Sequence, residues 1–237
     1  MIDIVLGMNF GDEGKGCVTD FICRKNNSDL VIRFNGGHQV GHTVYNNDNT
    51  MYHVFHSFGA ASFKNIKTYW SKYCTFYPIG FVNEYDDLTK NKKCNPKIII
   101  NPLCPVTTIY DVFSNQQYEK YIKKDGSVGV GVGKTYERSE TPYKLYFKDL
   151  LFDDILKHKL AIIKNNYYQF KNDLCLDEEK TFLNAIDKIK DLINNEIIEI
   201  KSEYECFLST YQPFNSLVFE GAQGILLDQD HGFFPNV

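Results

Sequence analysis

The feature that most constrains the fold of this chain is a short apolar run that ends in a glycine-rich segment. Residues 2–6 read Ile-Asp-Ile-Val-Leu, and residues 7–16 read Gly-Met-Asn-Phe-Gly-Asp-Glu-Gly-Lys-Gly. The pattern predicts a strand, a tight loop and then a helix over 15–24. Such a helix start leaves several backbone N–H groups unpaired and aimed at one point, with the helix dipole behind them. We therefore expect a phosphate site here, with a plain strand-to-helix connection as the structural alternative.

The loop departs from the standard phosphate-binding loop at two positions. That loop has Gly five residues before its Gly-Lys pair and Ser or Thr after it, where this chain has Asn9 and Gly16. The hydroxyl that usually binds magnesium is therefore missing. Asp12 lies within the loop instead, where its carboxylate could bind a hard cation or take a proton from a substrate beside the phosphates. Lys15 adds a mobile positive charge at the same point.

Short apolar runs with the form of buried strands occur at 2–6, 30–34, 97–101 and 216–220. The first two, with the helix between them, predict a βαβ unit. We predict an α/β fold with a mostly parallel central sheet and flanking helices, similar to P-loop nucleoside triphosphatases, with loops gathered at the carboxyl edge of the sheet. The sequence shows no clear boundary, so residues 1–237 are expected to form a single nucleotide-binding domain.

Between 150 and 210 the apolar residues change to helical spacing. They recur at Phe182, Ile186, Ile189, Ile193 and Ile197. Asp177 and Glu178, at the start of this stretch, suit a helix N-terminus. We predict a helical insertion over 150–210 that serves packing rather than chemistry.

The composition excludes several classes of protein. With 43% apolar and 24% charged residues the chain is typical of a soluble globular protein, and its net charge of −4 argues against a nucleic-acid-binding face. Its seven cysteines are odd in number and form no Cys-x-x-Cys pair, which favours reduced thiols in a cytosol. We expect no export leader, and no apolar run approaches the roughly 20 residues that a membrane span requires. We expect a cytoplasmic protein, in the host cytoplasm if the source is viral.

The second apolar run leads into residues 33–43, Arg-Phe-Asn-Gly-Gly-His-Gln-Val-Gly-His-Thr. His38 and His42 are four residues apart and could share a metal on a helix, but the glycines around them make a helix improbable. The better functional interpretation is a loop that carries a proton donor beside a nucleotide phosphate. The alternative is a structural turn in which the histidines make local hydrogen bonds.

Two more glycine-rich segments follow. Residues 126–134 read Gly-Ser-Val-Gly-Val-Gly-Val-Gly-Lys, which is similar to a second anion site or, equally, to a segment where backbones pack closely. Residues 219–224 read Phe-Glu-Gly-Ala-Gln-Gly, again a strand followed by a glycine loop. There the amide of Gln223 could both donate to and accept from a base edge, or could simply be a polar strand end.

In this order, the four segments resemble the adenylosuccinate synthetase family. The family motifs correspond to residues 11–16, 33–43 and 219–235, and the resemblance spans the chain, most weakly over 45–120 and in the helical insertion. The resemblance implies a ligase that transfers the γ-phosphate of GTP to the 6-oxygen of IMP and then lets the amino group of L-aspartate displace that phosphate. It also implies Mg²⁺ as cofactor and a homodimer.

The resemblance also implies roles for individual residues. Asp12 matches the general base that takes the N1 proton of the purine, His42 matches the acid on the phosphate side, and Lys15 would neutralise the phosphoryl oxygens. The carboxylate of Asp12 and the backbone carbonyl of Gly41 match the magnesium ligands. The nucleotide-binding positions are Gly11, Asp12, Glu13, Gly14, Lys15, Gly16, Cys17, Gly41, His42 and Thr43.

The expected substrate-binding positions are Asp12, Gln39, Ser127, Val128, Arg138 and Gln223. Gln223 matches the amide that reads the purine 6-position. Several positions depart from the family: Gln39 replaces Asn, and Ser127 and Val128 replace two threonines. Pro142 lies near where the family has an arginine that reaches the IMP phosphate across the dimer, so we expect Arg138 to substitute for it.

Two alternatives stay open. Parts of the sequence look more like a compact branch that includes phage enzymes acting on dGMP with ATP, although that branch usually lacks an aspartate at position 12. Residues 235–237 also end the chain inside a family motif, so the resemblance implies the N-terminal part of the enzyme, without the portion that binds aspartate and selects the base. Such a chain could bind purine nucleotides, or pair with a full-length subunit, without turnover. Taken without the resemblance, the phosphate chemistry also fits a nucleotide-dependent phosphotransferase or NTPase that does not use aspartate.

Overall fold

The structure is a computed structural model that describes residues 1–46, 48, 50–122, 126–168, 176–208, 214–228 and 230–233. Position 229 and the end of the last motif, 234–237, lie outside the described residues, as does Cys175. No helix among the described residues combines the length and the apolar character that crossing a bilayer would require.

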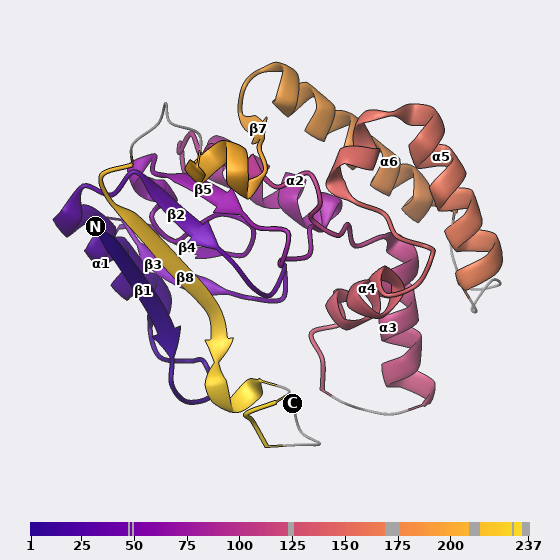
Figure 1. Ribbon diagram of the computed structural model, residues 1–237, viewed down its shortest axis with the longest axis horizontal. Coiled ribbons are helices and arrows are strands. Elements are labelled where there is room, and N and C mark those ends of the chain that lie inside the picture. Colours follow the sequence, from indigo (N-terminus) through magenta and orange to yellow (C-terminus); the bar gives the residue numbers. More distant parts are fainter. Residues whose placement is uncertain are drawn as a thin grey trace.

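A single parallel sheet forms the centre of the molecule, in the order β1-β8-β2-β5-β6-β7 (Figure 1). Its strands are β1 (Ile2–Gly7), β2 (Leu30–Arg33), β5 (Lys67–Trp70), β6 (Ile98–Ile100), β7 (Ile198–Ile200) and β8 (Leu217–Gly224). All neighbouring pairs are parallel. The predicted α/β class is confirmed, but β8 lies between β1 and β2, so the two strands of the predicted βαβ unit are not neighbours.

The described helices of eight residues or more are α1 (Lys15–Asn26), α2 (Pro78–Asp86), α3 (Ile109–Tyr121), α4 (Val132–Ser139), α5 (Asp153–Ile162) and α6 (Leu176–Asn194). A two-stranded antiparallel hairpin, β3 (His42–Tyr45) with β4 (Tyr52–Phe55), follows the second predicted motif. Short helical turns occur at 62–64, 87–91, 147–151, 163–167, 204–208 and 225–227.

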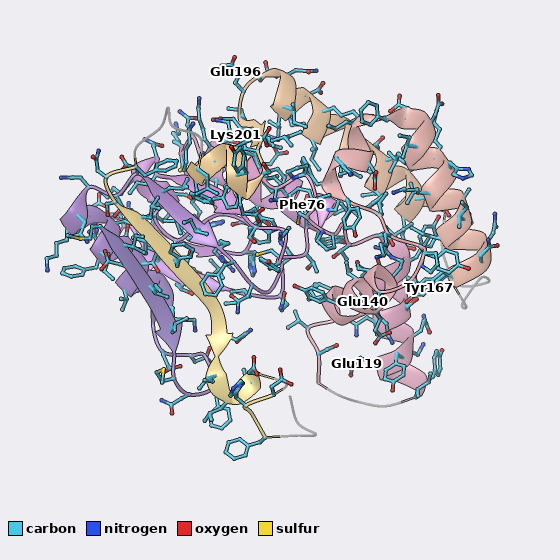
Figure 2. All side chains as sticks on the ribbon, viewed as in Figure 1. Phe76, Glu119, Glu140, Tyr167, Glu196 and Lys201 are labelled. Carbon is cyan, nitrogen blue, oxygen red and sulfur yellow. The ribbon has the colours of Figure 1, made fainter. Side chains whose placement is uncertain are left out.

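The main core joins the sheet to the helices. Trp70, Ile98 and Ile100 lie on one face of the sheet and pack in the same apolar cluster as Phe182 of α6. Phe76 lies between the sheet and the helices in Figure 2 and is almost fully buried. Because the fully buried side chains bridge strands and helices, the described part of the chain packs around one principal core.

The helical insertion predicted over 150–210 is confirmed only in part. α5 and α6 lie within it, and Phe182, Ile186 and Ile189 are buried along one face of α6. The prediction missed β7, which pairs with β6 and completes the central sheet. Ile197 belongs to the turn after the helix. An Ile-Glu-Ile run of three residues is too short to distinguish from a helix end by its period alone.

Candidate functional site

Three of the predicted motifs meet at the carboxyl ends of β1, β8 and β2. The backbones approach closely: a Cβ atom on Gly16 would lie 2.8 Å from the Cβ of His42, and one on Gly11 would lie 2.7 Å from Oε1 of Gln223. Motifs that are far apart in the sequence therefore form one surface at the edge of the sheet, where α/β proteins usually bind their ligands.

The first glycine loop is shaped by Glu13. Its carboxylate accepts hydrogen bonds from the backbone N–H groups of Asn9, at 3.1 Å, and Met8, at 3.0 Å. The bond from Asn9 is the main cause that holds the pKa of Glu13 below its usual value, and the bond from Met8 adds to it. Glu13 therefore organises the loop from within, and its own backbone N–H donates to the carbonyl oxygen of Gly11 at 2.9 Å.

Lys15 opens α1 and is only 3% exposed. Its Nζ atom donates to the carbonyl oxygen of Gly11 at 2.5 Å. Burial lowers the pKa of Lys15, and the carboxylates of Glu13, Asp12 and Glu220 oppose this effect only in part. The N-cap residue Gly14 has φ 75° and there is no side-chain cap, so the first N–H groups of α1 are not taken by a capping side chain.

Asp12 lies at the tip of this loop and is exposed. Its carboxylate makes no hydrogen bond within the part of the chain that the structure describes. Gly41 is also exposed, immediately before β3. The remaining predicted positions of the phosphate loops, Cys17 and Thr43, are exposed as well, and Cys17 Sγ lies 3.4 Å from the carbonyl oxygen of Thr43.

His42 is held by groups on β8. Its Nδ1 lies 2.6 Å from Oε1 of Glu220, and its Nε2 lies 3.2 Å from the carbonyl oxygen of Ala222. Glu220 is fully buried, and its other oxygen accepts the backbone N–H of Ala60 at 3.1 Å. The ring is thus fixed by two acceptors. His38 does not join it: His38 lies against His56 and Ser57 on the other side of the loop.

Sequence reasoning missed Glu220 and Arg33 as functional candidates. Arg33 ends β2, is fully buried, and is in register with Glu220 on β8 and Trp70 on β5. Its guanidinium carbon lies 5.4 Å from the centre of the Trp70 ring. Its three side-chain nitrogens have no hydrogen-bond partner within the described residues. The available signal was a charged residue at the carboxyl end of an otherwise apolar strand.

Residues of the 126–134 segment and Gln39 line a common pocket. The pocket has a volume of about 460 Å³ and is lined by Gln39, Ser127, Val128 and Lys134 among others. Ser127 is positioned by α3, because Asn115 donates to its hydroxyl at 2.9 Å. Three predicted substrate-binding positions thus share one cavity.

Arg138 does not reach this pocket, and the expectation that it contacts a substrate phosphate is wrong. The side chain is fully buried, with Nε 2.9 Å and Nη2 2.8 Å from the carboxylate of Asp111. It also donates to the carbonyl oxygens of Tyr143 and Val106. Helical spacing explains the error, because Arg138 and Thr135 face inward while Lys134 lines the pocket.

Comparison with known proteins was made for the whole chain. The family model described as adenylosuccinate synthetase matches residues 4–237. The chain is 35% identical over 247 residues to an adenylosuccinate synthetase of Wigglesworthia glossinidia brevipalpis, covering 99% of this chain and 55% of that protein. It is 32% identical over 252 residues to that of Buchnera aphidicola subsp. Baizongia pistaciae, covering 99% and 54%. The chain spans about half the length of the curated relatives it matches.

Two solved structures have a similar fold. A fully ligated adenylosuccinate synthetase from Plasmodium falciparum matches with a TM-score of 0.78 and 22% identity, over 100% of this chain and 54% of that one. The succinoaminodeoxyadenylate synthetase of cyanophage S-2L, bound to dGMP and dATP, matches with a TM-score of 0.64 and 13% identity, over 99% and 54%.

Proposed function

The chain belongs to the adenylosuccinate synthetase family, and on that premise we propose that it provides the nucleotide-phosphate half of a ligase joining L-aspartate to C6 of IMP with GTP hydrolysis. Phosphoryl transfer to the 6-oxygen would give a 6-phosphoryl intermediate, from which aspartate displaces phosphate. The observation that carries the proposal is the meeting of Lys15, His42 and Gln223 with the Asp12 loop at one edge of the sheet.

Asp12 is the proposed general base. The purine oxygen is a weak nucleophile until N1–H is lost, and a carboxylate within hydrogen-bond reach of N1 supplies that step. Asp12 suits this role because it is exposed at the loop tip and its carboxylate is free of hydrogen bonds within the described residues. Gln223, beside Gly11, would contact the 6-position of the same purine.

The proposed phosphate site combines backbone and side-chain donors. The uncapped start of α1 offers N–H groups, and Lys15 holds an ammonium against the loop. The guanidinium of Arg33, unpaired within the described residues, adds positive potential from the carboxyl end of β2. His42 is the proposed acid on the phosphate side: its Nδ1 would stay with Glu220, while its Nε2 would exchange the Ala222 carbonyl for a phosphoryl oxygen. Together these groups would stabilise charge that develops during phosphoryl transfer.

The proposed magnesium ligands are the Asp12 carboxylate and the Gly41 carbonyl oxygen. No group of three His, Cys, Asp or Glu suited to a metal occurs among the described residues. The donor set nevertheless fits Mg²⁺, which usually takes one or two protein oxygens and completes its shell with phosphates and water. When bound, the ion would neutralise charge on the phosphoryl oxygens.

The pocket of Gln39, Ser127 and Val128 is the proposed site of the purine monophosphate. Lys134, which pairs with Glu137 at the pocket wall, is the proposed cation for the phosphate there, since Arg138 is committed to Asp111. We further propose the homodimer and the cytoplasmic location expected for the family.

Two other functions are favoured by particular observations. Use of dGMP and ATP is favoured by the fold shared with the phage enzyme that was solved with dGMP and dATP. Purine-nucleotide binding without turnover is favoured by the donors of the proposed phosphate site, Lys15 and the uncapped start of α1, which need no group outside the described residues. The retained Asp12 favours IMP over dGMP.

The test compares Asp12→Asn with the exposed helical control Asp154→Asn. Purified protein, alone and supplied with the remaining portion of a curated relative, is assayed for phosphate release and adenylosuccinate with IMP, GTP, Mg²⁺ and aspartate. We expect Asp12→Asn to abolish turnover while nucleotide binding largely survives, because the backbone donors persist. Turnover with dGMP and ATP but not with IMP and GTP would select the second function. Calorimetric binding without turnover in any combination would select the third.

A further inference from the structure

Arg33 is a buried cation that forms no ion pair within the described residues. Its side chain is fully buried, and its three nitrogens have no hydrogen-bond partner there. The ring of Trp70, whose centre lies 5.4 Å from the guanidinium carbon, attracts the charge through its face. A buried charge is nevertheless costly unless a group of opposite charge compensates it. We therefore looked for an acid on the same side of the sheet.

Glu220 is a buried acid that lacks a Lys or Arg partner. Three of the five buried carboxylates in the described part of the chain pair with Arg or Lys, namely Asp20, Asp111 and Asp149. The other two, Glu84 and Glu220, have only histidines as ion-pair partners in that part. Glu84 lies on α2, whereas Glu220 lies on β8, the strand beside Arg33. The acid without a cation is thus next to the cation without an acid.

Strand register places Arg33 and Glu220 on the same face of the sheet. β2 and β8 are neighbouring parallel strands, and these two residues are paired across them (Figure 1). Paired residues point to the same side of a sheet, and neighbouring strands lie about 4.8 Å apart. Lys15 is affected by both charges: burial lowers its pKa, Glu220 opposes this effect and Arg33 adds to it. The three charges therefore lie within electrostatic reach of one another.

The carboxylate of Glu220 determines how the ring of His42 is held. One oxygen lies 2.6 Å from Nδ1 of His42, and the other accepts the backbone N–H of Ala60 at 3.1 Å. A carboxylate accepts hydrogen bonds and does not donate them, so the proton between the two side chains belongs to Nδ1. The hydrogen bond at one ring nitrogen fixes the orientation of the other. The direction of Nε2 thus depends on the carboxylate staying in place.

We propose that Arg33 is a positioning residue for His42 that acts through Glu220. Its buried charge compensates that of the carboxylate, which stays in place as the acceptor of Nδ1 and leaves Nε2 toward the phosphate side. Electrostatic attraction suits this role because it requires no direct contact and is stronger between buried groups than in water. The inference rests on the proposed function for the role of His42 as the acid, but the positioning itself requires no turnover.

The experiment follows the ring nitrogens of His42 by ¹⁵N NMR at constant pH, without nucleotide, with His42→Gln to assign the signals. Arg33→Met removes the charge and Arg33→Lys keeps it. The matched control Arg24→Met removes the charge of another arginine, on α1. We expect the Nδ1–H signal to be lost in Arg33→Met and kept in the other two variants, because only Arg33→Met leaves the buried carboxylate uncompensated. The exposed His158 should give the same signals throughout.

Glu220→Gln tests whether Arg33 acts through the carboxylate. Glutamine has the same shape without the charge, so the same signal should be lost, and adding Arg33→Met should change nothing further. Arg33→Gln replaces Arg33→Met if urea midpoints show that the latter does not fold. The proposal is overturned by a signal that survives in folded Arg33→Met, Arg33→Gln or Glu220→Gln, or by one that Arg33→Lys also removes.

Addition of GTP and Mg²⁺ to the unmodified chain separates this inference from the proposed function. The Nε2 signal of His42 should shift when a phosphoryl oxygen replaces the Ala222 carbonyl as its partner. An Nε2 signal that does not respond to GTP contradicts the proposed acid. It leaves the positioning of the ring by Arg33 supported, provided that Arg33→Met still removes the Nδ1–H signal.

Discussion

Two helices of this molecule, α1 and α4, begin in nearly the same backbone conformation but in different surroundings. Gly14 precedes α1 with φ 75° and ψ 23°, and Gly131 precedes α4 with φ 77° and ψ 13°; neither helix has a side-chain N-cap. A Cβ on Gly14 would meet nothing within 4 Å, whereas one on Gly131 would lie 2.6 Å from the backbone nitrogen of Val112. The first glycine is required by conformation alone, and the second by conformation and packing.

The lysines that follow these two glycines also differ in their surroundings. Lys15 is buried and bonded to the loop backbone, whereas Lys134 lies over the Tyr118 ring and pairs with the exposed Glu137. The same arrangement, a glycine with positive φ followed by a helix with a lysine near its start, thus occurs twice in different surroundings. At α1 the space around Gly14 is open and the cation is fixed. At α4 the start is packed against α3 and its cation is at the surface.

The largest effect is expected near the C-terminal end of α4, where Arg138 pairs with Asp111 of α3. Arg138→Ala should lower the free energy of unfolding by about 3–5 kcal/mol, because it leaves the buried Asp111 carboxylate without its partner. Lys134→Ala, four residues earlier on the exposed side, should change it by less than about 1 kcal/mol. Urea unfolding monitored by circular dichroism measures both. Equal losses for the two variants would contradict the inward role of Arg138.

The glycines themselves give a direct test of the comparison. Gly131→Ala should cost about 3 kcal/mol, because left-handed strain is combined with a clash against α3. Gly14→Ala should cost about 1 kcal/mol from the left-handed conformation alone. The difference between the two urea midpoints is the measured quantity. If Gly14→Ala were as costly as Gly131→Ala, the space around Gly14 would not be open.

Nucleotide binding should separate the two lysines. Lys15→Met is expected to weaken GTP or ATP binding by about 2 kcal/mol, roughly 30-fold, through loss of a charge-assisted contact. Lys134→Met should leave triphosphate affinity nearly unchanged and weaken the monophosphate instead. Titration calorimetry with each nucleotide checks this, with urea midpoints as a control for folding. A reversed pattern would exchange the proposed phosphate sites.

Acid should affect the 33–43 segment, which carries His38, more than the start of α1. Burial lowers the pKa of His38 from 6.5 to about 4. The unfolded chain therefore binds more protons between these values, and the stability contributed by neutral His38 is complete above pH 6.5 and is lost as the pH falls toward 4. At pH 5 the loss should be about 1–2 kcal/mol.

The variant His38→Asn should flatten this dependence, while His158→Asn, on the exposed side of α5, should keep it. Urea midpoints at pH 7, 6, 5 and 4.5 measure the slope. A steep slope that survives His38→Asn would assign the acid sensitivity to another group.

What could be predicted from sequence was local. The strand, loop and helix from Ile2 to Asn26 are contiguous, and glycine chemistry marks their boundaries, so both elements were found. The placement of β8 between β1 and β2 was not predicted, because it depends on pairing across the length of the chain. β5, which reads Lys-Thr-Tyr-Trp, has too short and mixed a pattern to separate from a loop.

The candidate site divides in the same way. Glycine-rich motifs identified Lys15, His42 and Gln223, and the structure brings the segments that carry them together. The Glu220 support of His42 and the unpaired guanidinium of Arg33 depend on strand register, which a single sequence does not give. Arg138 was misassigned because its nearness to Pro142 along the chain was considered without the face of the helix on which it lies.

The position of β8 has a consequence for synthesis on the ribosome. β1 leaves the exit tunnel first, but the strand that fills the slot between it and β2 begins only at residue 217. Until then, β1 and β2 each have a strand edge without its backbone hydrogen bonds. The β8 residues that pack beside the first glycine loop are also missing. Late insertion of a central strand makes folding slow and leaves the nascent chain open to aggregation. We expect such a chain to depend on chaperones that bind nascent polypeptides.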